Sequence, residues 1–341
     1  MLRQLARLTR PLPAAGPGAL GVAIYDHPDG AVVARESGLE GVTCVDDVAR
    51  LLSVLCDVWE RARLPWLERW ARGLLGFVLW MQQPDGTWLN FVTGWDGEKN
   101  LHGITSRSGQ NFWHARALAG VAKAAAVFDD EPARAAYRLG LSRAAGDDAP
   151  PDIRALHLRT LLLDPDADLA LARRWADEIA SCREGLVLKN SAFEVGEPHL
   201  WAHIQEGVLA SASARLGEPA LLETAVRSAA EVILPAIERG FVGRTTIPYE
   251  VSSCVAVCDA LQAATADARW ASAGADARRW FDLRDASGAA VYDRGTGRVA
   301  DGVDDGRVSA NSGAEANICA AEALLEDAVA IAERMPDPFA G

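Results

Sequence analysis

Residues 112–128 read FWHARALAGVAKAAAVF, and this stretch decides the fold. Only Arg116 and Lys123 carry charge within it, and small or apolar side chains occupy nearly every side of the helix it would form. Alanine, its commonest residue, has the highest helix propensity. A helix that is apolar all round is buried on every side. The stretch is therefore expected to be an inner helix of a mostly helical protein.

The same kind of segment recurs along the chain. Further inner-type members are DDVARLLSVLCDVW (46–59), IRALHLRTLLL (153–163), IQEGVLASASARLG (204–217), SSCVAVCDALQAA (252–264) and GAEANICAAEALL (313–325). Segments with a charged stripe alternate with them, as in WLERWARGLLGF (66–77) and LARRWADEIA (171–180). A spacing of about 40 to 70 residues between inner members is typical of repeated helical hairpins. The sequence predicts an all-α fold, an (α/α)6 toroid of helical hairpins.

Apolar residues at i, i+3, i+4 and i+7 indicate the individual helices. The predicted ranges are Val45–Arg63, Trp66–Gln82, Asn111–Phe128, Glu131–Ala145, Asp152–Leu163, Ala167–Ser181, Leu200–Leu216, Pro219–Glu238, Glu250–Thr265, Ala266–Trp280 and Gly313–Glu333. The last range must hold a final hairpin or a truncated outer helix. Residues 1–341 are expected to form one domain, with residues 1–40 as an N-terminal arm and lead-in segment that is frayed at its start.

Three connections are long for a compact domain, and loops of this length are usually functional. They cover residues 83–110, 182–199 and 282–311. All three lead into inner helices, so we expect them to gather at one rim of the toroid. The functional site is predicted at that rim.

Composition narrows the class of protein. Lys and Arg total 34 against 47 Asp and Glu, for a net charge of −13. This balance opposes nucleic-acid binding, because phosphate contacts need Lys and Arg. No stretch is long and apolar enough to span a bilayer, and prolines interrupt residues 1–20, so a signal peptide is not expected. We expect a soluble, cytoplasmic protein of unknown oligomeric state.

The six cysteines are dispersed and lack a CxxC pair. They are Cys44, Cys56, Cys182, Cys254, Cys258 and Cys319. In a chain of this size they are expected to be buried, reduced thiols. His199 and His203 have the i, i+4 spacing of a helical metal pair, but the sequence between them is not HExxH. No metal and no cofactor is predicted.

Carboxylates at the starts of inner helices are the candidate catalytic groups. Asp46 and Asp47 open one inner segment, and Glu315 lies in the first turn of the last. Each also fits a purely structural role at the start of its helix, because N-caps and first turns favour acidic side chains. A cap needs only one carboxylate, however, so the second aspartate requires its own explanation. In a toroid the last inner helix packs beside the first, so Glu315 is expected to face the aspartate pair.

Aromatic and polar residues near the same helix starts are the candidate substrate-binding groups. They are Trp95, Arg107, Asn111, Trp113, His114, Trp201, His203, Glu206, Tyr249 and Glu250. Trp113 also suits the core, and a lone histidine on a helix is more often a core residue. Paired carboxylates with aromatic platforms suit sugars: one carboxylic acid protonates the leaving oxygen, and the other carboxylate activates water or attacks the anomeric carbon.

Three segments resemble the motifs of a known family. CVDDVARLL (44–52), SGQNFWHARALAG (108–120) and DGVDDGRVSANSGAEANICAAEALL (301–325) are similar to the TxDDxARAL, EDxxGRxxWALG and NxGAExxxxxLLAL motifs of bacterial α/α-toroid proteins. Those proteins often accompany glycosyltransferases and belong to the six-hairpin glycosidase-like superfamily. Gln110 and Asn111 stand where that family has acidic or small residues. If those positions are acidic in the family, one catalytic carboxylate is missing here.

The leading hypothesis is a carbohydrate-active enzyme, a glycoside hydrolase acting on an oligosaccharide or glycoconjugate, with Asp46 or Asp47 as one carboxylate and Glu315 as the other. A noncatalytic glycan-binding toroid serving glycosyltransferase machinery is the alternative. A terpene-cyclase-like enzyme is a third hypothesis, because Asp46-Asp47 is similar to acidic cyclase motifs. The DDVAR segment lacks the third aspartate of DDxxD.

Overall fold

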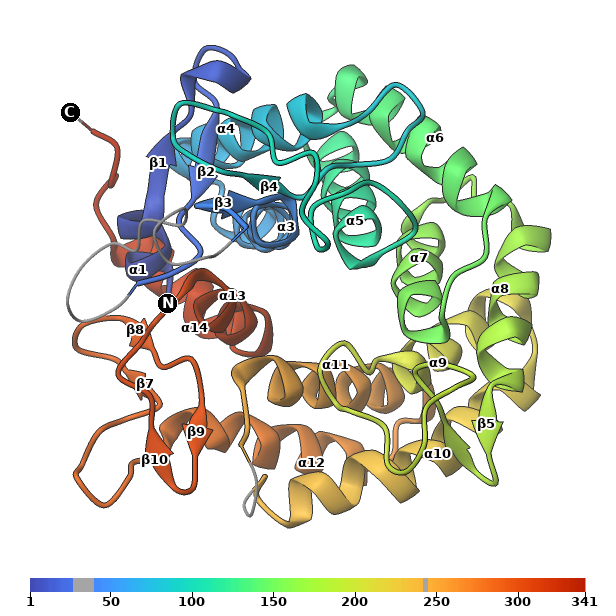
Figure 1. Ribbon diagram of the computed structural model, residues 1–341. Helices are drawn as coiled ribbons and strands as arrows, with labels where there is room; N and C mark the ends of the chain where they lie inside the picture. Colours follow the sequence, from blue (N-terminus) through green and yellow to red (C-terminus); the bar gives the residue numbers. More distant parts are fainter. Residues whose placement is uncertain (27–39, 242–244, 341) are drawn as a thin grey trace. The chain divides into compact units, whose positions relative to one another are not determined.

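Paired helices make up most of the computed structural model, which describes residues 1–26, 40–241 and 245–340. The chain divides into two compact units, and each is described by itself. The first unit comprises Met1–Asp148, Tyr292–Asp301 and Ser309–Gly341, and the second comprises Ala149–Val291 and Gly302–Val308. Figure 1 labels their elements. Neither the one-domain organisation nor the gathering of the long loops at one rim is tested, so both stay predictions.

The first unit is built around three helices that we class as inner. Its helices are α1 (Leu2–Leu8), α3 (Val45–Ala62), α4 (Pro65–Met81), α5 (Phe112–Phe128), α6 (Glu131–Gly146), α13 (Ala314–Ala323) and α14 (Leu325–Arg334), with a 3-10 turn η1 (Pro13–Ala15). Its strands are β1 (Thr9–Pro11), β2 (Leu20–Val22), β3 (Thr43–Cys44), β4 (Phe91–Val92), β7 (Tyr292–Asp293) and β8 (Arg298–Val299). The inner helix α3 contacts both α5 and α13, so the last inner helix lies beside the first, as predicted.

The second unit consists of three helical hairpins. They pair α7 (Pro151–Leu163) with α8 (Leu169–Ser181), α9 (Gln205–Leu216) with α10 (Pro219–Glu238), and α11 (Pro248–Thr265) with α12 (Ala268–Arg279). Short strands β5 (Arg183–Glu184), β6 (Val187–Leu188), β9 (Val303–Asp304) and β10 (Arg307–Val308) and a 3-10 turn η2 (Trp280–Asp282) complete it. Helix α9 contacts α7 and α11, which makes these three the inner helices of the unit. The strands within residues 1–26, 40–241 and 245–340 form antiparallel two-stranded ladders.

Burial follows the apolar pattern of the sequence. The segment FWHARALAGVAKAAAVF is α5, and its consecutive residues from His114 to Leu118, which cover every side of the helix, are buried; this confirms it as an inner helix. Helix starts use the acceptors that such positions favour: the side chain of Asn111 accepts from the His114 N–H, and that of Asp130 from the Ala133 N–H. Five cysteines are buried, as predicted, and Cys182 is partly exposed.

The N-terminal arm differs from the expectation of a frayed segment. Residues 2–8 form α1, which contacts α13, and the side chains of Met1, Leu2 and Leu5 have no exposed surface. Burial of three large apolar side chains outweighs the low stability of an isolated seven-residue helix. Residues 27–39 of the predicted lead-in segment lie outside the described residues.

Two predicted helices have different bounds. The range Gly313–Glu333 is two helices, α13 and α14, because the backbone leaves the helical region at Leu324 (φ −115°, ψ 48°). Helix α9 begins at Gln205 rather than Leu200, because Ala202 adopts the left-handed conformation (φ 57°). Within the described ranges, no helix is long and apolar enough to cross a membrane.

Candidate functional site

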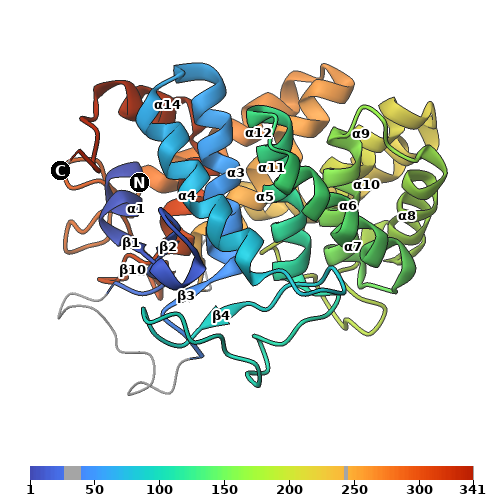
Figure 2. The ribbon, with the colours of Figure 1, turned by 90° about the horizontal axis from the view of Figure 1, so that it is seen from above.

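The predicted catalytic carboxylates meet at what we call the Arg50 cluster: Asp46, Asp47, Arg50, Arg116 and Glu315. The segment between α4 and α5 lies across the start of α3, where the Asn90 carbonyl accepts from the Val45 N–H and its side chain from the Asp46 N–H (Figure 2). The Cys44 sulfur accepts from the Asp47 N–H at 3.4 Å. Because these other groups cap α3, neither aspartate side chain is needed as the cap.

Arginines hold all three carboxylates. The Arg50 Nη2 donates to Asp47 Oδ1 at 2.9 Å and to Glu315 Oε2 at 2.8 Å, so the two carboxylates flank one nitrogen. Arg50 Nε lies 3.4 Å from Asp46 Oδ1, and Arg116 forms an ion pair with the same carboxylate. Three carboxylates thus share two guanidinium groups. Such a network is well suited to stabilise helix starts.

The members of the Arg50 cluster differ in exposure and proton affinity. Asp47 is 4% exposed, whereas the Glu315 side chain is 46% exposed. Burial raises the pKa of Asp47 to about 6; Arg50 opposes this rise, and the negative charges of Asp46 and Glu315 add to it. A carboxyl group with this pKa can hold a proton near neutral pH. Its burial limits contact with a substrate.

Sequence-predicted binding residues around α5 serve the packing of the helix. Asn111 is its cap, Trp113 Nε1 donates to the Trp88 carbonyl at 3.0 Å, and His114 has no exposed surface. The His114 ring lies edge-on to Trp88 with centroids 5.2 Å apart, and burial lowers its pKa to about 4. The structure therefore places His114 in the core of the first unit. Trp95, in a turn after β4, is partly exposed, and Arg107 is exposed.

A second group of polar residues lies in the second unit, around the start of α7 and the segment before α9. We call it the His199 cluster: Asp152, Asn190, Glu194, His199 and Trp201. The His199 and Trp201 rings stack with centroids 3.8 Å apart and 6° between their planes. His199 Nδ1 lies 3.0 Å from the Trp201 carbonyl, which accepts only, so Nδ1 carries a proton. In the neutral ring Nε2 is then the basic nitrogen.

The basic nitrogen of His199 faces a carboxyl group. His199 Nε2 lies 3.9 Å from Asp152 Oδ2. Burial lowers the pKa of His199, so the imidazole is neutral at pH 7. Burial also raises the pKa of Asp152 to about 6, although the Ile153 N–H donates to its carboxylate at 2.7 Å and opposes the rise. A neutral imidazole beside a carboxylate is a general base whose protonated form has a counter-charge.

Glu194 and Asn190 position the segment that carries His199. The Glu194 carboxylate accepts from the Asn190 N–H at 2.9 Å, from Asn190 Nδ2 at 2.9 Å and from the His199 N–H at 3.4 Å. Asn190 Nδ2 also donates to the His199 carbonyl at 3.0 Å. The two ends of the loop are therefore fixed to one another. Ala202, just beyond Trp201, has the uncommon positive φ that often occurs at functional sites.

His203 and Glu206 form a fully buried pair rather than an open binding surface. His203 Nε2 lies 3.0 Å from Glu206 Oε1, and His203 Nδ1 lies 2.7 Å from Asn190 Oδ1. Burial acts to raise the pKa of Glu206, but His203 and a 2.6 Å hydrogen bond from Ser228 hold it below its usual value. Neither side chain has exposed surface, so the structure places His203 and Glu206 in the interior of the second unit.

The remaining predicted residues lie at the start of α11 or next to His199. Trp201 is partly exposed, and the Tyr249 ring lies 6.5 Å from it between centroids. Glu250 is buried, and its carboxylate accepts from the Ile247 N–H at 3.4 Å, so it closes the start of α11. Sequence reasoning omitted both His199 and Asp152 from the candidate site residues, and it considered His199 only as half of a metal pair. For Asp152 a signal was available. Its signal was the same as that of Asp46, an acidic residue in the first turn of an inner helix.

Comparisons with known proteins bear on the fold. No family model and no curated protein sequence matches this chain. Solved structures do match. The alignment with a sugar epimerase from a ruminal bacterium has a TM-score of 0.66 at 12% identity and covers 96% of this chain and 95% of the epimerase chain. A D-mannose isomerase gives a TM-score of 0.64 at 10% identity, over 91% of each chain. A GH76 α-mannanase of Bacteroides thetaiotaomicron gives 0.55 at 11% identity, over 85% of this chain and 87% of its own.

At these identities the likeness concerns the fold alone. The chain has the all-α (α/α)6 toroid fold, which confirms the predicted fold, and at the level of the fold it is similar to six-hairpin glycosidase-like structures. By their names, the similar structures are of carbohydrate-active enzymes, and they include both sugar-isomerising and glycoside-hydrolysing members.

Proposed function

We propose that this protein is a carbohydrate-active enzyme that transfers a proton at carbon in a reducing sugar, as an isomerase or epimerase does. The observation that carries the proposal is the neutral, partly exposed imidazole of His199, stacked on Trp201 and facing Asp152 at 3.9 Å. Histidine is the side chain best matched to proton transfer near neutral pH. The names of the sugar epimerase and the D-mannose isomerase agree with this reaction class.

The proposed reaction starts from the open-chain aldose. His199 Nε2 takes the proton from C2, the C2–H electron pair forms the C1–C2 double bond of an enediolate, and the carbonyl oxygen takes the negative charge. Asp152 stabilises the imidazolium that forms, because an opposite charge within about 4 to 6 Å favours the charged form. Transfer of the hydroxyl proton from O2 to O1, with return of the carbon-derived proton to C1, gives the ketose. Return of the proton to C2 after the enediolate has turned its other face toward the imidazolium of His199 gives the epimer.

Proton transfer is measured directly by exchange with solvent. The protein is incubated in D2O with D-mannose, D-glucose or cellobiose, and loss of the C2 proton signal is followed by NMR. We expect exchange with at least one sugar, and a rate lower by about a hundredfold or more in His199→Gln. His102→Gln, at an exposed histidine of the first unit, is the matched control and should exchange at the wild-type rate. Equal exchange in His199→Gln would refute the proposal.

A glycoside hydrolase is the second candidate, favoured by the Arg50 cluster. Asp47, with a pKa of about 6, would protonate the leaving oxygen, and the half-exposed Glu315 would attack or activate water. The binding of Arg50 to both carboxylates counts against it, because a guanidinium between them favours their ionised forms. The test is the release of new reducing ends from mannotriose or cellotriose. If the wild type releases them and Glu315→Gln does not, the protein is a glycoside hydrolase rather than a proton-transfer enzyme. Binding without either product would indicate the noncatalytic toroid.

A further inference from the structure

A cavity of about 690 Å³ lies in the second unit beside the segment that carries His199. Its volume is in the range of pockets that hold small ligands. Apolar side chains form part of its wall: Val187, Pro198, Leu200, Val232, Ala236 and Phe241. Gly196 and five charged residues form the rest: Glu184, Lys189, Glu197, Glu231 and Arg239. We call this cavity the α10 cleft, because Glu231, Val232 and Ala236 belong to that helix.

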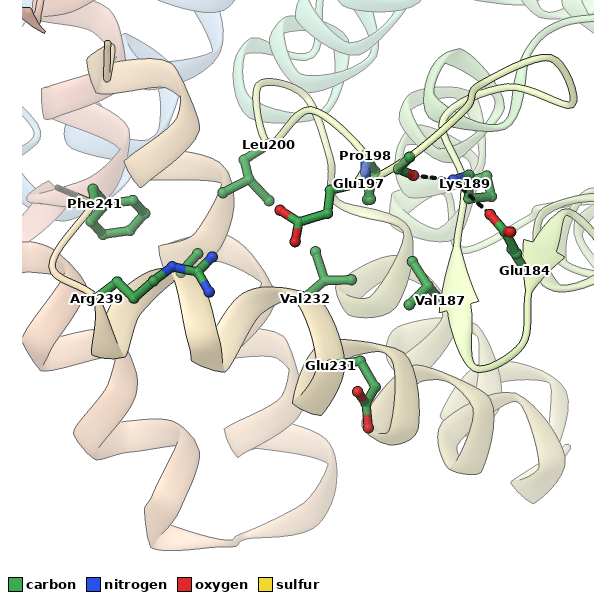
Figure 3. Close-up of a pocket in the computed structure, with 12 residues that line it drawn as sticks. Glu184, Val187, Lys189, Glu197, Pro198, Leu200, Glu231, Val232, Arg239 and Phe241 are labelled. Carbon is green, nitrogen blue, oxygen red and sulfur yellow. Dashed lines mark hydrogen bonds and ion pairs between the residues drawn. The ribbon is translucent and has the colours of Figure 1, made fainter. Parts of the chain in front are cut away.

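Two charged side chains of the α10 cleft lie close to one another, and the other three line the cleft without such a partner among the described residues. Lys189, whose side chain is only 6% exposed, donates to the Gly196 carbonyl and lies 3.3 Å from Glu184. Glu197, Glu231 and Arg239 make no ion pair or side-chain hydrogen bond within the part of the chain that the structure describes. Figure 3 shows the Glu197 carboxylate and the Arg239 guanidinium pointing into the cleft from two different segments.

An exposed Arg239 just after the end of α10 also suits the helix dipole, which favours a cation there. The dipole does not explain why Glu197, from a separate segment, points into the same space. A carboxylate and a guanidinium that converge over an apolar wall without pairing present an acceptor and a donor to one ligand. A neutral ligand with several hydroxyl groups bonds to both, since each hydroxyl donates and accepts.

We propose that the α10 cleft is an ancillary saccharide-binding site, separate from the site at His199. The choice of a saccharide among polyhydroxyl ligands rests on the proposed function. Pro198 and Leu200 line the cleft, whereas His199 between them stacks on Trp201. A saccharide in the cleft therefore contacts both chain neighbours of the proposed base.

Binding to the cleft is tested without reference to turnover. Mannotriose and cellotriose are titrated separately into the whole protein by calorimetry, using the His199→Gln variant so that the sugar is not converted. The cleft variant combines Glu197→Gln with Arg239→Met. The matched control combines Glu223→Gln with Arg227→Met, an exposed ion pair on the same helix and outside the cleft. Circular dichroism and melting establish that each variant is folded.

We expect one trisaccharide to bind the His199→Gln protein and the matched control equally, and the cleft variant at least about tenfold more weakly, since hydrogen bonds to two charged groups are lost. Val232→Trp, which fills the cleft, should weaken binding in the same way. Equal trisaccharide binding in the His199→Gln protein, the matched control, the cleft variant and Val232→Trp would overturn the inference. Binding of the zwitterion glycine betaine, with no binding of either sugar, would also overturn it. Solvent exchange at C2 without cleft binding would refute only the cleft, and cleft binding without exchange would refute only the proposed reaction.

Discussion

Replacing Asp152 by Asn should make the protein more stable and less active at pH 7. The carboxyl group is buried at the start of α7, and its pKa of about 6 lies above the ordinary value of 3.8. Burial therefore disfavours the ionised form that predominates at pH 7. A shift of two units corresponds to about 3 kcal/mol, at 1.36 kcal/mol per unit. Asparagine removes the charge and keeps an oxygen that can accept from the Ile153 N–H, so we expect a gain of about 1 to 3 kcal/mol.

The pH dependence identifies the cause of this gain. Below pH 3.8 the carboxyl group is protonated in both folded and unfolded chains, so Asp152 costs nothing there. Between pH 3.8 and about 6 the folded chain binds more protons than the unfolded chain, so the wild type loses stability as pH rises. The advantage of Asp152→Asn should appear across this window and stay constant above it.

The assay is thermal unfolding of both proteins from pH 4 to pH 8, with C2 exchange in D2O measured alongside. We expect melting temperatures that coincide near pH 4 and differ by a few degrees at pH 7. Exchange should be slower in the variant, because the imidazolium of His199 loses its counter-charge. A variant that is less stable at pH 7, or a difference that does not change with pH, would refute this reasoning.

Three further results are expected. Arg50→Met should destabilise the protein by about 3 to 5 kcal/mol in urea unfolding, and by more at pH 8 than at pH 5, since Asp47 is left buried without its guanidinium; an unchanged midpoint would contradict this. The pKa of His114 is about 4 in the folded protein, so the unfolded chain binds more protons than the folded chain between pH 4 and 6.5, and stability is lost as pH falls through that window. In His114→Leu the loss of unfolding free energy over this window should be smaller by about 3 kcal/mol. Identical pH profiles of stability in the two proteins would contradict this. Thiol titration of the unfolded protein without reductant should detect six free groups, and two or none would indicate disulfides.

Much of the fold could be predicted because each inner helix carries its own signal. Residues 112–128 are apolar nearly all round, and the chain forms α5 over those residues. The pairing of α3 with α13 followed from hairpin repetition, and Glu315 does share Arg50 with Asp47. A final hairpin within Gly313–Glu333 was expected, but the position of its break at Leu324 could not be predicted, because the residues around it are good helix formers.

The candidate site was only partly predictable, because a residue type does not specify its partners. Asp46 looked catalytic from its position, yet Arg116, seventy residues away, occupies its carboxylate. His203 was predicted to bind substrate from within the helix Leu200–Leu216, but the left-handed Ala202 places that segment before α9, and the imidazole is in the interior. The proximity of His199 to Asp152 depends on a tertiary contact across 47 residues that no local pattern encodes.

The carboxylate of Glu194 closes residues 190–199 into a ring by binding the N–H groups of Asn190 and His199. The two side chains that flank Glu194 are almost free of contacts: Phe193 is 93% exposed and Val195 is 95% exposed. Mutation of Phe193 or Val195 therefore leaves the ends of the ring in place. Natural or laboratory evolution can alter what these two side chains meet in solution while the imidazole of His199 keeps its position. The loop separates the residues that are free to vary from those that must stay fixed.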